Sequence, residues 1–425
     1  MKLLIKNGRV VDPSSRTDET LDILIDKGKI IEVKAKIEAD VANTVDASRL
    51  VIAPGFIDMH VHLREPGNED KETIRTGSLA AAKGGYTSIC CMPNTNPVND
   101  SRGVTDYIIT ESKKLGLVNV FPIAAITKGL RGEELTDMAD LVAAGAVAFS
   151  DDGRPVENSQ IMRRALEYSR FLNALIIDHC EDRNLSEDGV MHEGYSSYLL
   201  GLRGIPAASE EIMVSRDLIL AEQANVKVHI AHLSVKGAVR AVAEARERKV
   251  KVTSEVTPHH LLLTDSALES YDPNLKVNPP LRSREDARAL LDAVKSGVID
   301  VFATDHAPHT PEEKDVEFDQ APFGINGLET AVSLLLDRLV NKNIITLSRF
   351  IEMSSTAPAR ILGLGSKGRI SPGADGDLTI LNLHKEVVVD VSKFQSKSRN
   401  NPFDTWKLKG APVMTIVGGK VVYPI

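Results

Sequence analysis

The chain has 425 residues, a net charge of −8 and 42% hydrophobic residues, which is an ordinary composition for a folded protein. This length allows two or three domains, or a single barrel of about 250 residues with a smaller domain attached. The acidic balance, spread without a basic block, argues against nucleic acid or an anionic membrane as the partner.

The N-terminus and the cysteines bear on the compartment. Lys6 interrupts the first apolar run, so the start is not expected to be a signal peptide. No stretch approaches the 18 or so apolar residues of a membrane span. The three cysteines, of which Cys90 and Cys91 are adjacent, cannot form a disulfide framework. We therefore expect a cytoplasmic protein.

The two ends of the chain share a pattern of short apolar strands separated by turn residues. Residues 2–53 contain turns such as Asn7-Gly8, and the last 60 residues include the strands that flank Gly418-Gly419. Each end alone is too small to bury a core. We predict that residues 1–53 and 362–425 pack together as one composite β-sandwich.

The middle of the chain, residues 54–361, alternates short apolar strands with helical segments such as 73–83. Eight strands are predicted there, at 51–63, 87–93, 119–126, 146–152, 174–180, 227–233, 251–258 and 299–306. Eight strands with intervening helices over about 300 residues predict an α/β fold of the (β/α)₈ barrel type. The connections at 180–207 and 306–324 are unusually long, as lids and binding loops are.

Residues that can bind metal lie at the C-terminal ends of these strands. In a (β/α)₈ barrel all eight ends meet at one mouth, so residues distant in sequence become neighbours. The set is His60, His62, Asp152, His179, His232 and Asp305.

His60 and His62 point to the same side of a strand, so both imidazoles can reach one ion. Alone, such a pair also fits two histidines on a half-exposed strand. Four imidazoles and two carboxylates at one mouth instead favour one or two zinc ions, with a carboxylate able to bridge them.

Asp305 can act as a ligand, as a general base or as both. His306 has the opposite strand parity and is expected to be structural, whereas His309 lies in the following loop, where it can contact substrate. Cys180 is expected to face away from the metal as a buried residue, with metal contact as the alternative. The remaining histidines are interpreted as structural.

Several motifs resemble those of the dihydroorotases of the amidohydrolase superfamily. The most specific is Pro54-Gly55-Phe56-Ile57-Asp58-Met59-His60-Val61-His62-Leu63-Arg64-Glu65-Pro66-Gly67. Similar strings occur at 91–95, 277–282, 303–309 and 368–378, so the resemblance covers nearly the whole chain.

The resemblance implies a zinc-dependent, reversible cyclisation of N-carbamoyl-L-aspartate to L-dihydroorotate, a step of pyrimidine biosynthesis. It assigns His60 and His62 to the more buried zinc, His179 and His232 to the more exposed one, and Asp305 to metal binding and general acid/base catalysis. Many relatives bridge the metals with a carboxylated lysine, but this chain has Asp151-Asp152 there, as a bacterial subgroup does. Asp152 is preferred over Asp151 as the bridge.

The substrate that the resemblance implies is a small anionic molecule, and its free carboxylate would require a cation. Arg64, on the same strand face as His62, can provide a bidentate fork, and Asn94 is placed to help it. The alternative for Arg64 is a surface salt bridge. The resemblance adds Asn278 and His309 to the substrate-binding set.

Two alternatives are retained for function and partners. One is a cyclic amidase of the hydantoinase or allantoinase type, although such enzymes usually keep the bridging lysine and lack Arg64. The other is a weakly active dihydroorotase-like subunit that scaffolds aspartate carbamoyltransferase. A complex with that enzyme is compatible with activity, and we also expect a homo-oligomer.

Overall fold

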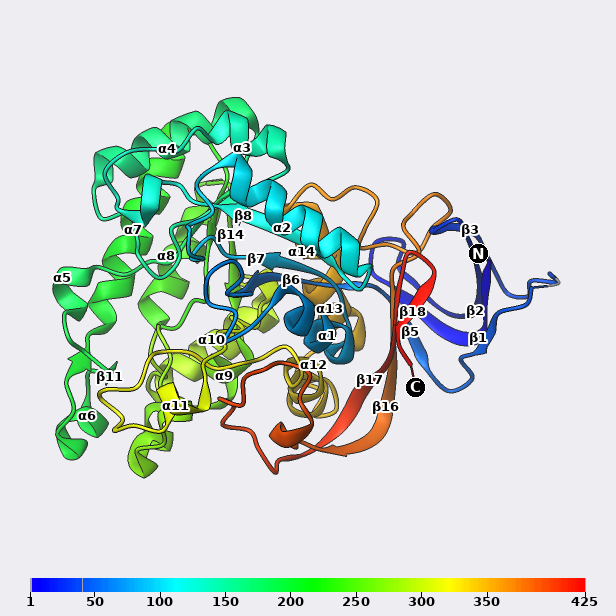
Figure 1. Ribbon diagram of the computed structural model, residues 1–425. Coiled ribbons are helices and arrows are strands. Elements are labelled where there is room, and N and C mark those ends of the chain that lie inside the picture. The colour runs from blue at the N-terminus through cyan, green and yellow to red at the C-terminus, as the bar shows by residue number, and fades with distance from the viewer. Residues whose placement is uncertain (1, 40, 425) are drawn as a thin grey trace.

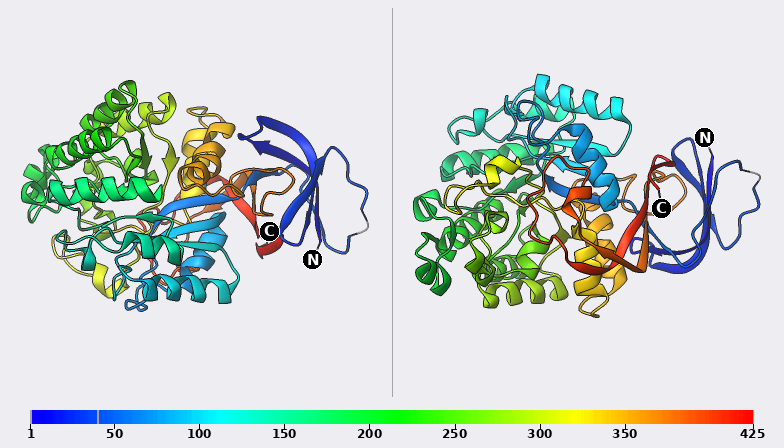
Figure 2. Two further views of the ribbon diagram at one scale, coloured as in Figure 1. Left: turned by 90° about the horizontal axis from the view of Figure 1, so that it is seen from above. Right: turned by 60° about the horizontal axis from the view of Figure 1, so that its bottom comes forward.

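A computed structural model describes residues 2–39 and 41–424, which are arranged around two large β-sheets (Figure 1). One sheet is the barrel, and the other lies beside it and contains strands from both ends of the chain. The first and last described strands, β1 (Leu3–Asp12) and β18 (Lys420–Tyr423), both belong to this second sheet, on one side of the barrel (Figure 2). No helix within the described ranges is long and apolar enough to cross a membrane.

The barrel sheet has eight parallel strands in sequence order. They are β6 (Phe56–Val61), β7 (Tyr86–Cys91), β8 (Asn119–Ala124), β9 (Ala148–Phe149), β10 (Ile176–Asp178), β13 (Val228–Ile230), β14 (Val252–Val256) and β15 (Val301–Phe302). A bridge between Val61 and His306 brings the last strand region against the first. The predicted (β/α)₈ barrel is confirmed.

Helices connect the strands and cover the outside of the barrel (Figure 1). The longer ones are α1 (Ile74–Gly84), α2 (Arg102–Leu115), α3 (Met138–Ala144), α4 (Ser159–Leu172), α7 (Ala207–Ala224), α8 (Lys236–Glu247) and α10 (Arg284–Ser296). In α1, the Thr73 side chain accepts a hydrogen bond from the Thr76 backbone, and Gly85 ends the helix with a φ of 92°. These are the capping residues expected at a helix start and end.

Short helices follow β15 and complete the barrel wall. They are α12 (Ala331–Leu335), η4 (Leu336–Val340), α13 (Leu347–Ile351), η5 (Glu352–Thr356) and α14 (Ala357–Ile361). Phe350 packs edge-on against Phe56 of β6, with ring centroids 5.5 Å apart. These helices therefore pack against the first barrel strand within one apolar core.

The second sheet confirms that the two chain ends associate. Its N-terminal strands are β1 (Leu3–Asp12), β2 (Thr17–Asp26), β3 (Lys29–Lys34), β4 (Thr44–Asp46) and β5 (Val51–Pro54), and its C-terminal strands are β16 (Leu378–Val388), β17 (Lys407–Val417) and β18 (Lys420–Tyr423). The two groups join where β5 pairs antiparallel with β16, with Ile52 opposite Ile380. Both isoleucines are fully buried in a shared apolar core. The exact domain limits at 53/54 and 361/362 stay a prediction.

The single strand predicted over 51–63 is divided in the structure. Its first part, β5, belongs to the terminal sheet, and its second part, β6, opens the barrel. The division falls at Gly55, where an added Cβ would lie 2.2 Å from the Thr87 hydroxyl oxygen. Close packing against β7 therefore requires glycine at the point where the chain passes between the sheets.

The two long connections contain structure of their own. The first holds α5 (Arg183–Ser186), β11 (Met191–His192), α6 (Tyr195–Leu200) and β12 (Gly204–Ile205), and the second holds α11 (Pro311–Lys314). A segment near the C-terminus fixes the second: the Asn400 side-chain amide donates hydrogen bonds of 2.9 Å to the carbonyls of Ala307 and Gly324. The terminal region thus supports a loop at the barrel mouth.

Candidate metal centre at the barrel mouth

The six expected metal-binding residues come from five strands and lie together at the C-terminal end of the barrel. His60 is in β6 and His62 follows it, whereas the others lie one to three residues beyond β9, β10, β13 and β15. All six are at most 5% exposed. Two of them adopt left-handed backbone conformations, His232 with a φ of 26° and Asp305 with a φ of 46°. Such strain at non-glycine residues is typical of functional sites.

Asp152 lies between the histidines. One carboxylate oxygen is 3.3 Å from His60 Nε2 and 3.6 Å from both His179 Nδ1 and His232 Nε2. The other oxygen is 3.4 Å from His62 Nε2. A single carboxylate therefore reaches all four imidazoles, as a group that bridges two ions must.

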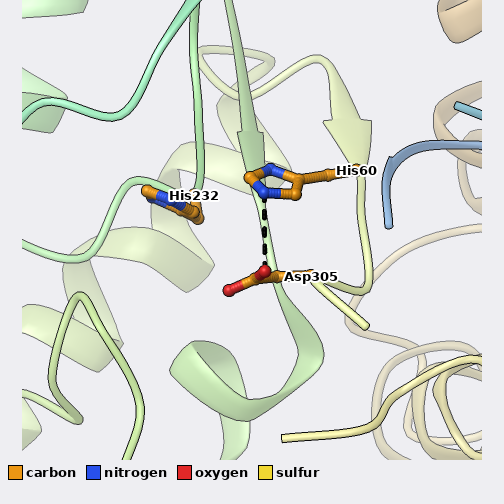
Figure 3. Close-up of side chains that lie close together, drawn as sticks. All are labelled: His60, His232 and Asp305. Carbon is orange, nitrogen blue, oxygen red and sulfur yellow. Dashed lines mark ion pairs between the residues drawn. The ribbon is translucent and has the colours of Figure 1, made fainter. Parts of the chain in front are cut away.

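Asp305 lies on the other side of the same cluster. Its Oδ1 is 3.1 Å from His62 Nε2 and 3.4 Å from His60 Nε2, and Figure 3 shows it facing His60 with His232 beside them. In three triads the ligand atoms lie within 4.8 Å of one another: His60 with His62 and Asp152, Asp152 with His179 and His232, and His60 with His232 and Asp305. The shared residues make these triads one continuous centre.

The donor atoms fit a metal ion. Among the described residues, His60 Nε2 and Asp152 Oδ1 are buried and have no hydrogen-bond partner. Leaving a buried polar atom unpaired costs about 1–3 kcal/mol, so such atoms call for a ligand. Imidazole nitrogens and carboxylate oxygens are the donors that zinc accepts.

The electrostatics of the cluster favour a cation. Burial lowers the pKa of His60, but the carboxylates of Asp152 and Asp305 outweigh it and raise that pKa well above its ordinary value. Burial raises the pKa of Asp305, yet His60 and His62 outweigh it and lower the value to about 2. His60 likewise outweighs burial at Asp152 and lowers that pKa well below its ordinary value. Both acids are therefore carboxylates at neutral pH, and positive charge is stabilised between them.

The choice between the two adjacent acids has a clear geometric basis. Asp151 points away from the histidines, and its Oδ1 accepts hydrogen bonds from the backbone of Ile126 at 2.7 Å and of Thr127 at 3.0 Å. Burial raises its pKa to about 6. Asp151 therefore holds the loop after β8, and of the two acids it is Asp152 that lies among the histidines.

Three of the histidines are held from outside the cluster by residues that contact their other ring nitrogen. Glu255 of β14 lies 2.7 Å from His60 Nδ1, Asn94 Oδ1 lies 2.9 Å from His62 Nδ1, and Glu181 lies 3.1 Å from His179 Nε2. Partners of this kind fix the ring orientation of metal ligands. Glu255 and Glu181 were not predicted from the sequence. Glu181 could have been found from its parity, since it is two residues after His179.

The cavity over this centre is about 170 Å³ in volume and holds most of the predicted substrate-binding residues. Arg64, Asn94 and Asn278 line it together with Phe323. His309 is next to Arg64, with 3.5 Å between its Nε2 and the guanidinium. The Asn400 side chain accepts a hydrogen bond of 3.2 Å from the His309 backbone and so fixes its position.

Arg64 is oriented toward this cavity by the loop after β15. Its Nε donates a hydrogen bond of 3.2 Å to the Pro308 carbonyl. Burial lowers its pKa, but nearby Asp305 and Glu313 oppose that effect, and an arginine stays charged at neutral pH. The cavity therefore contains one fixed cation next to the metal centre.

Other polar residues near the mouth have structural partners. His306 lies 3.3 Å from the buried Glu72 and accepts a hydrogen bond from the Gly327 backbone. The Cys180 thiol lies 3.6 Å from Asp217 of α7, on the helix side of the strand. Burial raises the pKa of this thiol well above its ordinary value, which disfavours the thiolate form that binds metal.

Comparison with known proteins identifies the family. A dihydro-orotase-like family model matches residues 49–238, and an amidohydrolase family model matches residues 229–423. The dihydroorotase of Pelotomaculum thermopropionicum is 54% identical over 422 residues, which cover 99% of this chain and 98% of that protein. The chain belongs to the dihydroorotase family. The predicted enzyme class, a cyclic amide hydrolase, is confirmed with it.

Further relatives and solved structures separate this family from its structural neighbours. The dihydroorotase of Syntrophus aciditrophicus is 50% identical and covers 100% of this chain and 99% of its own length. An L-hydantoinase from Arthrobacter aurescens superposes with a TM-score of 0.89 over 99% of this chain and 96% of its own, but is 27% identical. A D-hydantoinase from Thermus sp. superposes with a TM-score of 0.83 and is 26% identical. The match covers 99% of this chain and 95% of that protein. The fold is shared, but the sequence does not favour the hydantoinase alternative.

Proposed function

We propose that this member of the dihydroorotase family is a zinc enzyme that interconverts L-dihydroorotate and N-carbamoyl-L-aspartate in pyrimidine biosynthesis. The observation that carries the proposal is the placement of Asp152 within 3.6 Å of all four histidines, at the base of a cavity that contains Arg64. A metal centre beside a fixed cation suits a cyclic amide that bears a carboxylate.

We assign His60 and His62 to one ion and His179 and His232 to a second, and Asp152 and Asp305 would supply the carboxylate ligands. When bound, zinc would polarise the amide carbonyl and make water nucleophilic near neutral pH. Four imidazoles and two carboxylates supply enough donors for one or two such ions.

Asp305 moves the proton in this proposal. In hydrolysis its carboxylate accepts a proton from the attacking water, and the resulting acid returns that proton to the ring nitrogen as the amide bond breaks. In cyclisation the same carboxylate takes the proton from the attacking ureido nitrogen and returns it to the carboxyl oxygen that leaves as water while the new amide bond forms. Its low pKa keeps it in the basic form before each cycle.

Arg64 binds the carboxylate that does not react, and Asn94, Asn278 and His309 complete the substrate contacts. The guanidinium offers parallel N–H donors that match a carboxylate. Asn278 also lines the cavity, with its amide 3.1 Å from Glu181. The ring of the substrate is thus held between fixed groups over the metal centre.

Replacing Arg64 with Met is expected to raise the KM for dihydroorotate about 10- to 100-fold and to change kcat little. The reason is that a charge-assisted hydrogen bond to a substrate carboxylate contributes about 1.5–3 kcal/mol to binding. Steady-state kinetics of the purified variant measure both constants. The matched control is Arg248→Met, because Arg248 forms an exposed ion pair with Glu222 far from the mouth. An unchanged KM in Arg64→Met would remove Arg64 from its role.

The activity itself is tested by measuring hydrolysis of dihydroorotate, hydantoin and allantoin by one metal-analysed sample. The proposal predicts turnover of dihydroorotate alone and a zinc content of one or two ions per chain. Faster turnover of hydantoin or allantoin would assign the chain to another cyclic amidase activity.

The partner and the compartment are further parts of the proposal. We propose a cytoplasmic homo-oligomer that also associates with aspartate carbamoyltransferase. The three free, buried cysteines suit a reducing compartment. Helix α6, in the long connection after β10, exposes Tyr195, Tyr198 and Leu199 by 79%, 87% and 60%, which is a feature of contact surfaces.

Adding aspartate carbamoyltransferase is expected to raise the turnover of this chain, because a partner on α6 would hold the connection beside the mouth in one position. The measurement compares dihydroorotate hydrolysis by the chain alone and by the mixture. Tyr198→Ser, on the exposed face of α6, should weaken the stimulation without changing the turnover of the isolated chain. Equal rates for chain and mixture would rule out activation by this partner.

A further inference from the structure

Glu255 is a carboxylate within the barrel that contacts both halves of the metal centre. It lies in β14 and is fully buried. Its Oε1 is 2.7 Å from His60 Nδ1 and accepts a hydrogen bond of 3.2 Å from the His232 backbone nitrogen. Its Oε2 is 3.1 Å from Nε2 of His229. Three polar groups from two other strands therefore meet at one side chain.

The contact with His60 determines which nitrogen of that ring faces the centre. A carboxylate accepts hydrogen bonds, so the proton of His60 is on Nδ1, toward Glu255. Nε2 is then the nitrogen that faces Asp152 and Asp305, where it has no hydrogen-bond partner among the described residues and where a metal ion would replace any proton that it carries. This is the tautomer that a metal ligand needs.

The contact with His232 fixes a backbone conformation. His232 has a φ of 26°, a left-handed value that residues other than glycine seldom adopt. The hydrogen bond from its backbone nitrogen to Glu255 links this strained residue to β14. The same carboxylate thus orients one ring assigned to the first ion and places the residue that carries a ring assigned to the second.

His229 contacts the second carboxylate oxygen of Glu255. Its Nε2 faces Glu255, and its Nδ1 lies 2.8 Å from the Thr253 hydroxyl, so it has no role at the metal centre itself. With His229 as a second partner, Glu255 cannot rotate away from His60 without breaking a buried hydrogen bond.

We propose that Glu255 is a positioning residue that sets the metal affinity of the centre through His60 and His232. The inference rests on the metal-binding roles assigned above, and it extends them to a residue that touches neither substrate nor ion.

The test measures zinc affinity by competition with a chromogenic chelator, using the metal-free full-length chain and its Glu255→Gln variant. Gln has the same shape but carries one acceptor oxygen, so it can satisfy only one histidine as before. Loss of such an outer partner typically weakens metal binding about 10- to 100-fold, and we expect a zinc Kd raised by that factor. Thermal unfolding of the metal-free proteins shows whether the variant is folded.

The matched control is Asp22→Asn, since Asp22 is a buried carboxylate of the terminal sheet that accepts hydrogen bonds from the backbones of Asn7 and Ile37. It should leave the zinc Kd unchanged. If Glu255→Gln does not fold, Glu255→Asp replaces it: the charge is kept, but the shorter side chain cannot span His60 and His229, and the Kd should again rise.

The outcomes separate the two proposals. A folded Glu255 variant with the zinc Kd of the unmodified chain would overturn the positioning role alone. An unmodified chain that binds no zinc would overturn the metal centre and this role with it. A Kd raised in the Glu255 variant but not in Asp22→Asn would support both.

Discussion

Replacing Asp305 with Asn is expected to lower the turnover of dihydroorotate by at least about 10³-fold while the chain stays folded. General acid/base catalysis contributes about 10²–10⁴-fold, and Asp305 is also assigned to the first ion. Asn is isosteric but cannot take up a proton. Its amide would also meet His62 Nε2, which lies 3.1 Å from Asp305 Oδ1. Steady-state turnover and thermal unfolding provide the two readouts.

The structure offers a control for Asp305→Asn in the same loop region. Asp315 ends α11 and is exposed, so Asp315→Asn should keep full turnover. If Asp305→Asn retained more than a tenth of the activity of the unmodified chain, the proton transfer would have to be assigned to another residue.

Replacing Asp152 with Asn is expected to remove at least one zinc ion per chain and, with it, the activity. An amide carries no charge, and four imidazoles without the bridging carboxylate would have to hold two cations close together. Metal content after dialysis, determined together with turnover, measures the effect.

The neighbouring acid provides the comparison. Asp151→Asn keeps an oxygen that can accept the hydrogen bonds from the backbones of Ile126 and Thr127, and it removes a charge whose burial raises the pKa of Asp151 to about 6. The free energy of unfolding should therefore fall by less than about 1 kcal/mol, and the variant should keep its zinc. The reverse pattern, with metal lost only from Asp151→Asn, would exchange the roles of the two acids.

The gathering of the six metal-binding residues could be predicted because topology alone brings them together. His60, His179 and Asp305 are distant in sequence, but each lies at the end of a barrel strand, and parallel strands in a closed barrel end at one mouth. The alternation of side chains along a strand likewise predicted that His306 points away from Asp305 and has a structural role. In the structure His306 contacts Glu72. Both predictions needed only the strand count and the alternation of side chains.

Glu255 could not be predicted in the same way. Its partners His60 and His229 are 195 and 26 residues away in sequence, and no local pattern specifies such pairs. The one available signal was an acidic residue within the barrel strand predicted over 251–258, where a charge is costly unless it is paired. That observation indicates a buried partner without identifying it.

The contacts between the C-terminal region and the barrel mouth could not be predicted from the sequence either. Asn400 lies in an irregular segment between η6 (Val391–Lys393) and β17, so it has no periodicity from which its direction could be inferred. It nevertheless contacts Ala307, Gly324 and His309. Contacts between irregular segments depend on the packing of the two sheets, which only the three-dimensional structure provides.

The most direct test of the account is a crystal structure of the zinc-loaded chain, with diffraction data recorded on both sides of the zinc absorption edge. We predict one or two anomalous peaks at the barrel mouth, at about 2.0–2.2 Å from the imidazole nitrogens of His60 and His62 or of His179 and His232, with Asp152 contacting each ion. Zinc bound elsewhere, or a mouth in which these side chains hold no ion, would contradict it.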